Sequence, residues 1–135
     1  MSRYLVNTIA QFLPMTGSGI PVSEFTPEIV KELLSNPNVI YIEEPGKGCI
    51  LGIVYPHFLN PEYTICQELG WWVEPEWRGT TLGVRLIKQF ETAAKLAGAD
   101  KIIMIRLDSL EPDKIEDIYL RTGYRPLERS FIKEL

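Results

Sequence analysis

Long apolar segments are missing from this sequence. No apolar run approaches the roughly 20 residues that a membrane-spanning helix needs. The opening residues, MSRYLVNTIAQFLP, interrupt their apolar run with Asn7, Thr8 and Gln11, unlike the core of a secretory signal peptide. We therefore expect a cytoplasmic protein.

Cysteine is also scarce. The chain has only Cys49 and Cys66, which lie in two separate β-like runs and lack the close spacing of metal or redox motifs. We expect both to be buried, reduced thiols, because free cysteine is among the most buried residue types. No metal site is predicted.

Positive charge is in deficit, with 14 Lys and Arg against 18 Asp and Glu and a formal net charge of -4. Nucleic-acid binding depends on clustered basic residues, so we expect no nucleic-acid partner. The composition, 45% hydrophobic and 24% charged, is that of an ordinary globular protein. A second domain would leave each half too small for its own core, so we predict one domain over residues 1–135.

Two helices are predicted in the first third of the chain. Ser2 is a candidate N-cap for a helix whose apolar residues recur at helical spacing, and the TGSG segment at residues 16–19 ends it. Thr26, followed by Pro27 at the first helical position, begins a second helix that stops before Pro37.

The centre of the chain changes to β character. VIYIEE from Val39, the turn PGKG and the run CILGIVYPHF predict a hairpin. A further strand is predicted over residues 64–73, then a helix over 81–97 and the apolar strand KIIMIRL over 101–107. This strand, helix and strand predict a right-handed parallel βαβ unit.

The C-terminal part predicts one helix and one strand. Ile115, Ile118 and Tyr119 share one helical side, the helix ends at Gly123, and YRPLERSFIKEL predicts a final strand. The segment RSFIKEL would present an open sheet edge, which suggests a homodimer, although such edges are also capped within a chain.

The turn between the strand at 64–73 and its following helix carries the clearest functional signal. The first N–H groups of a helix lack internal partners and lie at the positive end of its dipole, so Gly79 and Gly83 would let a phosphate approach them. RGTTLG is neither a P-loop nor a G-x-G-x-x-G dinucleotide motif. The alternative is an ordinary strand-to-helix turn whose glycines serve close packing.

Two motifs resemble the GNAT superfamily of acyltransferases. WWVEPEWRGTTLG, at residues 71–83, is similar to the family's strand ending in Val, then x-Pro-x-x-Arg-Gly, then a Gly that opens the helix. IYLRTGY, at residues 118–124, resembles the family's C-terminal LYEKLGF, one strand and one helix later. The resemblance covers about residues 39–135, a stretch that looks like small members often encoded by phages.

The resemblance implies the fold. We expect the α/β (α+β) class, with a mixed, mostly antiparallel sheet, a central parallel βαβ unit and helices on both faces. Family members begin with a strand, whereas this chain begins with a predicted helix, so either the sheet lacks its first strand or the family's opening is truncated here. Two residues depart from the motifs: Thr81 stands at a family glycine, and Pro112 lies where many members have Asn.

The resemblance also implies a site for acetyl-CoA. The pantetheine arm is expected between the strands at 64–73 and 101–107, paired with main-chain groups near Trp72 and Val73, one of which could hold the thioester oxygen as charge develops. The pyrophosphate is expected on the N–H groups at the helix start. The residues in this second set are Arg78, Gly79, Thr80, Thr81, Leu82 and Gly83.

Glu68 and Tyr119 are the candidate catalytic residues. Direct transfer needs a neutral amine, so a base must take its proton. Regular alternation would put Glu68 on the side of Cys66, Gly70 and Trp72, whereas a bulge in this strand would change that parity. Tyr119 matches the family's Tyr before x-x-x-Gly-aromatic and would protonate the CoA thiolate. The alternatives are a Glu that orients substrate or forms an ion pair, and a Tyr that only fills the core.

His57 and Asn60, in the loop PHFLNP, are candidate acceptor-binding residues, and His57 is an alternative base. A single loop histidine is also explained by a structural hydrogen bond. The sequence thus predicts an acetyl-CoA-dependent N-acetyltransferase acting on a primary amine of a small molecule or protein. The alternatives are a non-catalytic GNAT-like CoA-binding or virion-associated module and a nucleotide-binding regulator.

Overall fold

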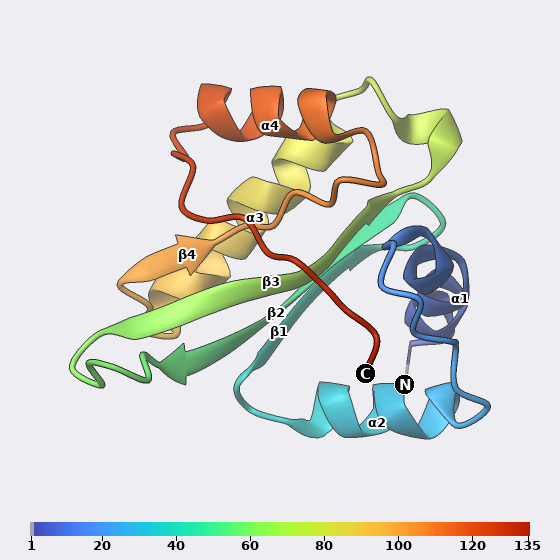
Figure 1. Ribbon diagram of the computed structural model, residues 1–135, viewed down its shortest axis with the longest axis horizontal. Helices are drawn as coiled ribbons and strands as arrows, with labels where there is room; N and C mark the ends of the chain where they lie inside the picture. Colours follow the sequence, from blue (N-terminus) through green and yellow to red (C-terminus); the bar gives the residue numbers. More distant parts are fainter. Residues whose placement is uncertain (1) are drawn as a thin grey trace.

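The computed structural model describes residues 2–135 as a four-stranded sheet with helices on both faces (Figure 1). The helices are α1 (Arg3–Phe12), α2 (Thr26–Ser35), α3 (Leu82–Leu96) and α4 (Pro112–Arg121). The strands are β1 (Val39–Glu44), β2 (Gly48–Pro56), β3 (Thr64–Val73) and β4 (Lys101–Ile103), and two 3-10 turns are η1 (Leu13–Met15) and η2 (Pro75–Trp77). None of the helices between residues 2 and 135 is long and apolar enough to cross a membrane.

The sheet has the order β1-β2-β3-β4, antiparallel except for the parallel pair of β3 and β4. The predicted hairpin and βαβ unit are therefore confirmed. Residues 2–38 contain no strand, which agrees with the expected loss of the family's first strand. Ser2 caps α1, because its hydroxyl oxygen accepts a hydrogen bond from the N–H of Leu5 at 2.9 Å.

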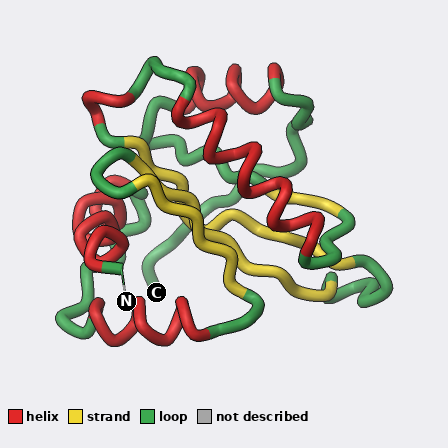
Figure 2. The backbone as a smooth tube through the Cα atoms, turned by 180° about the vertical axis from the view of Figure 1, so that it is seen from behind, coloured by secondary structure: helices red, strands yellow, loops and turns green. Residues whose placement is uncertain are grey.

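Helices cover both faces of the sheet (Figures 1 and 2), and each face has its own core. On one face, α3 buries Leu82, Leu86, Phe90 and other residues at helical spacing against β2 and β3, and Tyr119 of α4 joins them. On the other face, α1 and α2 pack over Cys49, Leu51 and Trp72, among others. Cys49 and Cys66 are free and buried, as predicted.

A β-bulge interrupts β3 and reverses the direction of its side chains. The register with β2 shifts after Leu51, which pairs with Gly70, because Gly52 pairs with Glu68 and Leu69 is left without an opposite residue. The prediction from regular alternation is therefore wrong beyond Glu68. Gly70 lies near Phe12 of α1, on the opposite face from Cys66.

The bulge gives the adjacent tryptophans different environments. Trp72 is 4% exposed in the core under α1 and α2, whereas Trp71 packs against the core under α3 and α4. Regular alternation would have given Trp72 the α3 side. The extra residue at Leu69 instead turns Trp71 towards α3 and α4.

The predicted strand over 101–107 is shorter than expected. Only three pairs join β3 to β4, from Ile65 with Lys101 to Gln67 with Ile103, and then the two segments separate. Beyond this point the N–H of Ile105 binds the side chain of Glu68 instead of a strand partner. The gap predicted between these segments is thus present.

The predicted final strand is absent, since residues 124–135 form no strand and their apolar side chains are largely exposed, including Phe131 and Ile132. This segment, red in Figure 1, instead crosses the face of the sheet that carries α1. An ion pair of 2.9 Å joins its Arg129 to Asp108. The argument for a homodimer through this strand edge therefore has no strand to support it.

Candidate active site

The turn after β3 exposes bare backbone at the start of α3. Gly79 has a φ of +80°, and no heavy atom lies within 4 Å of the position that a Cβ would take. The Thr80 hydroxyl donates to the carbonyl of Trp77 at 2.6 Å and accepts from the N–H of Leu82 at 3.3 Å. The remaining first-turn N–H groups of α3 lack partners within the helix, so the turn can receive an anion.

Gly83 also has a role in packing. A Cβ at this position would lie 3.0 Å from Cζ2 of Trp71, which is an unusually close approach. The absence of a side chain at Gly83 therefore makes room for the Trp71 indole. This agrees with the alternative that the glycines of this turn serve close packing, and it leaves room for a ligand as well. Leu82 is 1% exposed, so its side chain belongs to the core and only its main chain can reach a ligand.

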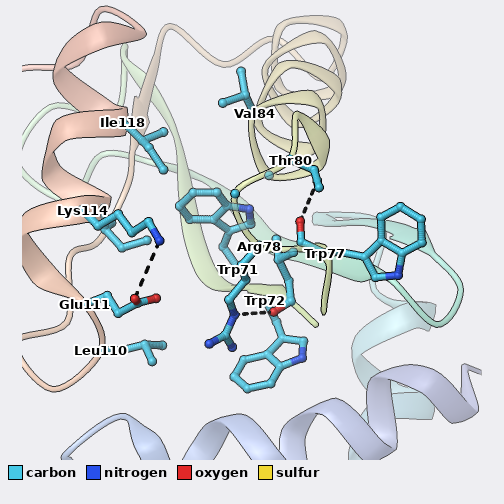
Figure 3. Close-up of a pocket in the computed structure, with 14 residues that line it drawn as sticks. Trp71, Trp72, Trp77, Arg78, Thr80, Val84, Leu110, Glu111, Lys114 and Ile118 are labelled. Carbon is cyan, nitrogen blue, oxygen red and sulfur yellow. Dashed lines mark hydrogen bonds and ion pairs between the residues drawn. The ribbon is translucent and has the colours of Figure 1, made fainter. Parts of the chain in front are cut away.

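A pocket of about 100 Å³ lies between the end of β3, the turn, the first turn of α3 and the start of α4 (Figure 3). It includes six of the eight predicted cofactor-binding residues, namely Trp72, Val73, Arg78, Gly79, Thr80 and Gly83. Thr81 and Leu82 are not among its lining residues. The α4 side, which the sequence reasoning missed, contributes Leu110, Glu111, Lys114, Ile115 and Ile118.

Arg78 is held in place within this pocket. Its Nε donates to the carbonyl of Val73 at 2.8 Å, and its guanidinium lies 4.9 Å from the centre of the Trp72 ring (Figure 3). These contacts leave the two terminal nitrogens available for a phosphate. Across the pocket, Lys114 lies 3.9 Å from Glu111, a solvent-exposed ion pair that holds Lys114 only weakly.

Glu68 and Tyr119 meet at the point where β3 and β4 separate. Oε1 of Glu68 accepts a hydrogen bond from the N–H of Ile105 at 3.4 Å, and the Tyr119 hydroxyl donates to the carbonyl of Ile105 at 2.8 Å. Both side chains are buried, with Glu68 5% and Tyr119 7% exposed. Glu68 and Tyr119, which are 51 positions apart in sequence, thus both form hydrogen bonds to Ile105 beside the gap between β3 and the segment after β4.

Burial changes the acidity of both groups. Desolvation raises the pKa of Glu68 to about 7, although the Ile105 N–H and the Tyr119 hydroxyl partly oppose this rise. Desolvation, followed by the nearby Glu68 charge, raises the pKa of Tyr119 far above its ordinary value. Near neutral pH, Glu68 can therefore exchange a proton while Tyr119 retains its own.

The structure does not bring His57 and Asn60 to this pocket. They lie in the loop at the Thr64 end of β3, whereas the pocket lies at the Val73 end, about 30 Å away for a ten-residue strand. Nδ1 of His57 accepts from the N–H groups of Leu59 and Asn60, at 3.1 and 3.2 Å. These bonds agree with the structural alternative for this histidine.

No cluster of three or more His, Cys, Asp or Glu side chains suited to a metal ion occurs within residues 2–135. Two tryptophans that line the pocket, Trp71 and Trp72, each have a buried Nε1 without a hydrogen-bond partner. The Trp72 ring belongs to the core under α1 and α2, whereas Trp71 packs on the side of α3 and α4. Only the placement of neighbouring elements could reveal an unpaired donor.

Comparison with known proteins gives one family and many similar folds. The acetyltransferase (GNAT) family matches residues 12–125. No curated protein matches the chain.

Solved structures with a similar fold include an acetyltransferase from Trypanosoma brucei, with 21% identity, a TM-score of 0.66 and coverage of 96% of this chain and 94% of that one. An aminoglycoside acetyltransferase from an uncultured soil metagenomic sample, in complex with trehalose, has 19% identity, a TM-score of 0.72 and coverage of 98% and 86%. AAC(6')-Iy, in complex with the bisubstrate analogue CoA-S-monomethyl-acetylneamine, has 14% identity, a TM-score of 0.73 and coverage of 100% and 94%. At these identities the likeness shows a shared fold.

Proposed function

Because the chain belongs to the GNAT acetyltransferase family, we propose that it transfers an acetyl group from acetyl-CoA directly to a primary amine. The observation that carries this proposal is the pair of Glu68 and Tyr119, buried together in the gap between β3 and the segment after β4. A proton acceptor with a pKa of about 7 and a phenol that retains its proton are the two groups that such a transfer needs.

The residues around the pocket fit an anionic donor. Gly79 leaves backbone accessible at the positive end of α3, and Arg78 keeps its terminal nitrogens free for phosphate oxygens. Lys114, on the far side of the pocket, is a second cation within the same lining. The pyrophosphate of acetyl-CoA would lie on this turn.

The separated strands provide main-chain partners for the pantetheine arm. Beyond Gln67, β3 has no strand on its β4 side, so the main-chain groups directed to that side are not paired in the sheet. Val73 and Trp72 end this part of the strand and line the pocket. A free N–H there would also stabilise the negative charge that develops on the thioester oxygen.

Glu68 would act as the base. The amine nitrogen attacks the thioester carbonyl carbon, and Glu68 accepts the proton that the nitrogen must lose, directly or through one water. The carbon–sulfur bond breaks and the sulfur leaves as a thiolate. Tyr119, whose hydroxyl is directed to the carbonyl of Ile105, would turn to the sulfur and donate its proton.

The alternative is a non-catalytic CoA-binding or virion-associated module with the same fold. Thr81 stands at a family glycine, and a side chain that narrowed the phosphate site there would favour this alternative. Thr81 is not among the residues that line the pocket. Pro112, which stands where many family members have Asn, is the first residue of α4. As a proline it has no amide N–H to offer a ligand. A cytoplasmic location and a relation to phage-encoded members stay predictions of the sequence.

The proposal is tested by titrating acetyl-CoA into the wild-type protein and Arg78→Ala in a calorimeter, followed by transfer assays on an amine panel. The panel includes an aminoglycoside, a polyamine and a peptide with N-terminal alanine, because some proteins of similar fold are named for aminoglycosides or for ribosomal-protein alanine. We expect binding that weakens in Arg78→Ala and transfer to at least one amine. Binding without transfer to any amine would support the non-catalytic module.

A further inference from the structure

Trp71 carries an unpaired hydrogen-bond donor into the proposed acetyl-CoA site. Its Nε1 is buried and has no partner among residues 2–135, although Trp71 lines the pocket (Figure 3). A buried N–H without a partner destabilises the folded protein, so native proteins rarely keep one. At a binding pocket, such a donor has a simple explanation if the ligand supplies the acceptor.

The position of the indole indicates which part of the ligand it would meet. Its Cζ2 lies against Gly83 in the first turn of α3, and its ring centre lies 5.9 Å from that of Tyr119 in α4. On the proposed function, the pyrophosphate lies at the turn and the reacting sulfur lies near Tyr119. The indole is therefore between these two points, along the course of the pantetheine arm.

We propose that the Nε1–H of Trp71 donates a hydrogen bond to a carbonyl or hydroxyl oxygen of the pantetheine arm of acetyl-CoA. The pantetheine arm offers amide carbonyls and one hydroxyl, all of which accept hydrogen bonds from a neutral N–H. The same indole supports the ring of Tyr119 from one side, so a single residue contacts both the donor and the candidate acid. This inference rests on the proposed function.

Three structural features combine to place the donor there. The bulge at Leu69 turns Trp71 towards α3 and α4, and the absence of a side chain at Gly83 lets the indole lie against the helix. Ile118 of α4 lines the same pocket. Because these elements surround the indole, its Nε1 is buried before the ligand arrives, and neighbouring side chains must shift for a ligand oxygen to reach the N–H.

The test compares wild-type protein with Trp71→Phe, which keeps an aromatic ring but lacks the N–H. Calorimetry would measure the Kd of acetyl-CoA and of adenosine 3',5'-bisphosphate, which shares the nucleotide end but lacks the pantetheine arm. We expect Trp71→Phe to weaken acetyl-CoA binding about 3- to 10-fold, the range for one neutral hydrogen bond. Binding of adenosine 3',5'-bisphosphate should change less than 2-fold, within about 0.4 kcal/mol.

Thr8→Val is the matched control, because Thr8 Oγ1 is also buried without a partner but lies in α1, outside the pocket lining. It should leave both Kd values unchanged. An unchanged acetyl-CoA Kd in Trp71→Phe would overturn the inference, and so would an equal loss for both ligands, which would indicate general damage to the pocket. If wild-type protein binds no acetyl-CoA, the proposed function itself fails.

Discussion

A carboxyl group buried between β3 and Ile105 has a measurable effect on stability. Desolvation raises the pKa of Glu68 from 4.5 to about 7, so the folded protein binds this proton more tightly than the unfolded chain does. The resulting stability is fully present below pH 4.5 and is lost as the pH rises to about 7. The free energy of unfolding lost in this way is about 3 kcal/mol.

We therefore expect Glu68→Gln, which is neutral at every pH, to be more stable than the wild type at pH 8 by up to about 3 kcal/mol. At pH 4 the difference should nearly vanish. Urea unfolding at the two pH values measures both free energies of unfolding. Glu62→Gln, in an exposed loop, is the control and should show no such dependence on pH; an equal response of the two variants would contradict the burial argument.

The same carboxyl group should appear in the kinetics. If Glu68 is the base, kcat/KM should rise with pH and level off above about pH 7, because only the ionised carboxylate accepts a proton. Glu68→Gln should lower the rate by about 100-fold or more and remove this rise. A pH profile measured with a responsive amine checks this, and a rise that persists in Glu68→Gln would assign the base to another group.

Tyr119 can be tested separately from Glu68. Tyr119→Phe removes the hydroxyl but keeps the ring against Trp71, so we expect kcat to fall about 100-fold while the Kd of acetyl-CoA changes little. Stopped-assay rates and calorimetry on the same preparation separate the two effects. A normal kcat would leave Tyr119 as a core residue that binds the Ile105 carbonyl.

At the scale of elements, the close contact between β2 and α3 depends on Gly52. A Cβ at Gly52 would lie 2.3 Å from Cζ of Phe90 and 2.8 Å from the main-chain oxygen of Gln67. The Phe90 ring of α3 can therefore lie against β2 at this position only because Gly52 has no side chain. The β-branched residues of β2 predicted the strand without this glycine. Only the packing of β2 against α3 explains why a glycine occupies position 52.

We expect Gly52→Ala to destabilise the protein by about 3 kcal/mol, because a rigid ring and a main-chain oxygen must both move. Gly70→Ala is the control, since its nearest neighbour is Phe12 at 3.5 Å, an ordinary contact. Thermal and urea unfolding measure both. Combining Gly52→Ala with Phe90→Leu should recover part of the loss, and a fully additive double variant would argue against this contact.

For the whole molecule, the C-terminal segment contributes little to the core. Residues 125–135 are all exposed and form no strand, and the ion pair of Arg129 with Asp108 is at the surface. Such a surface ion pair contributes little to stability, because solvent screens the two charges. We expect a chain ending at residue 128 to fold with a Tm within a few degrees of the full chain, as measured by circular dichroism. A collapse of the Tm would show that this segment stabilises the sheet.

The sequence predicted the elements that have local signals. Helical spacing of apolar residues, the cap at Ser2 and Pro27 at a helix start identified the helices, and β-branched runs with glycine turns identified β1 to β3. The two motifs around Arg78 and Tyr119 predicted residues that lie at or beside one pocket. The spacing of nearby residues was sufficient to predict these helices, strands and motifs, because each of them depends on residues close together in the sequence.

Tertiary structure decided the rest. The final segment has strand-like residues but no strand partner, and β4 ends where its neighbour separates from it, because β pairing needs a second chain segment at the right distance. One extra residue at Leu69 exchanged the environments of Trp71 and Trp72. The sequence alone determined which residues are present at the site, and only the packing of β3, α3 and α4 decided where their polar atoms lie.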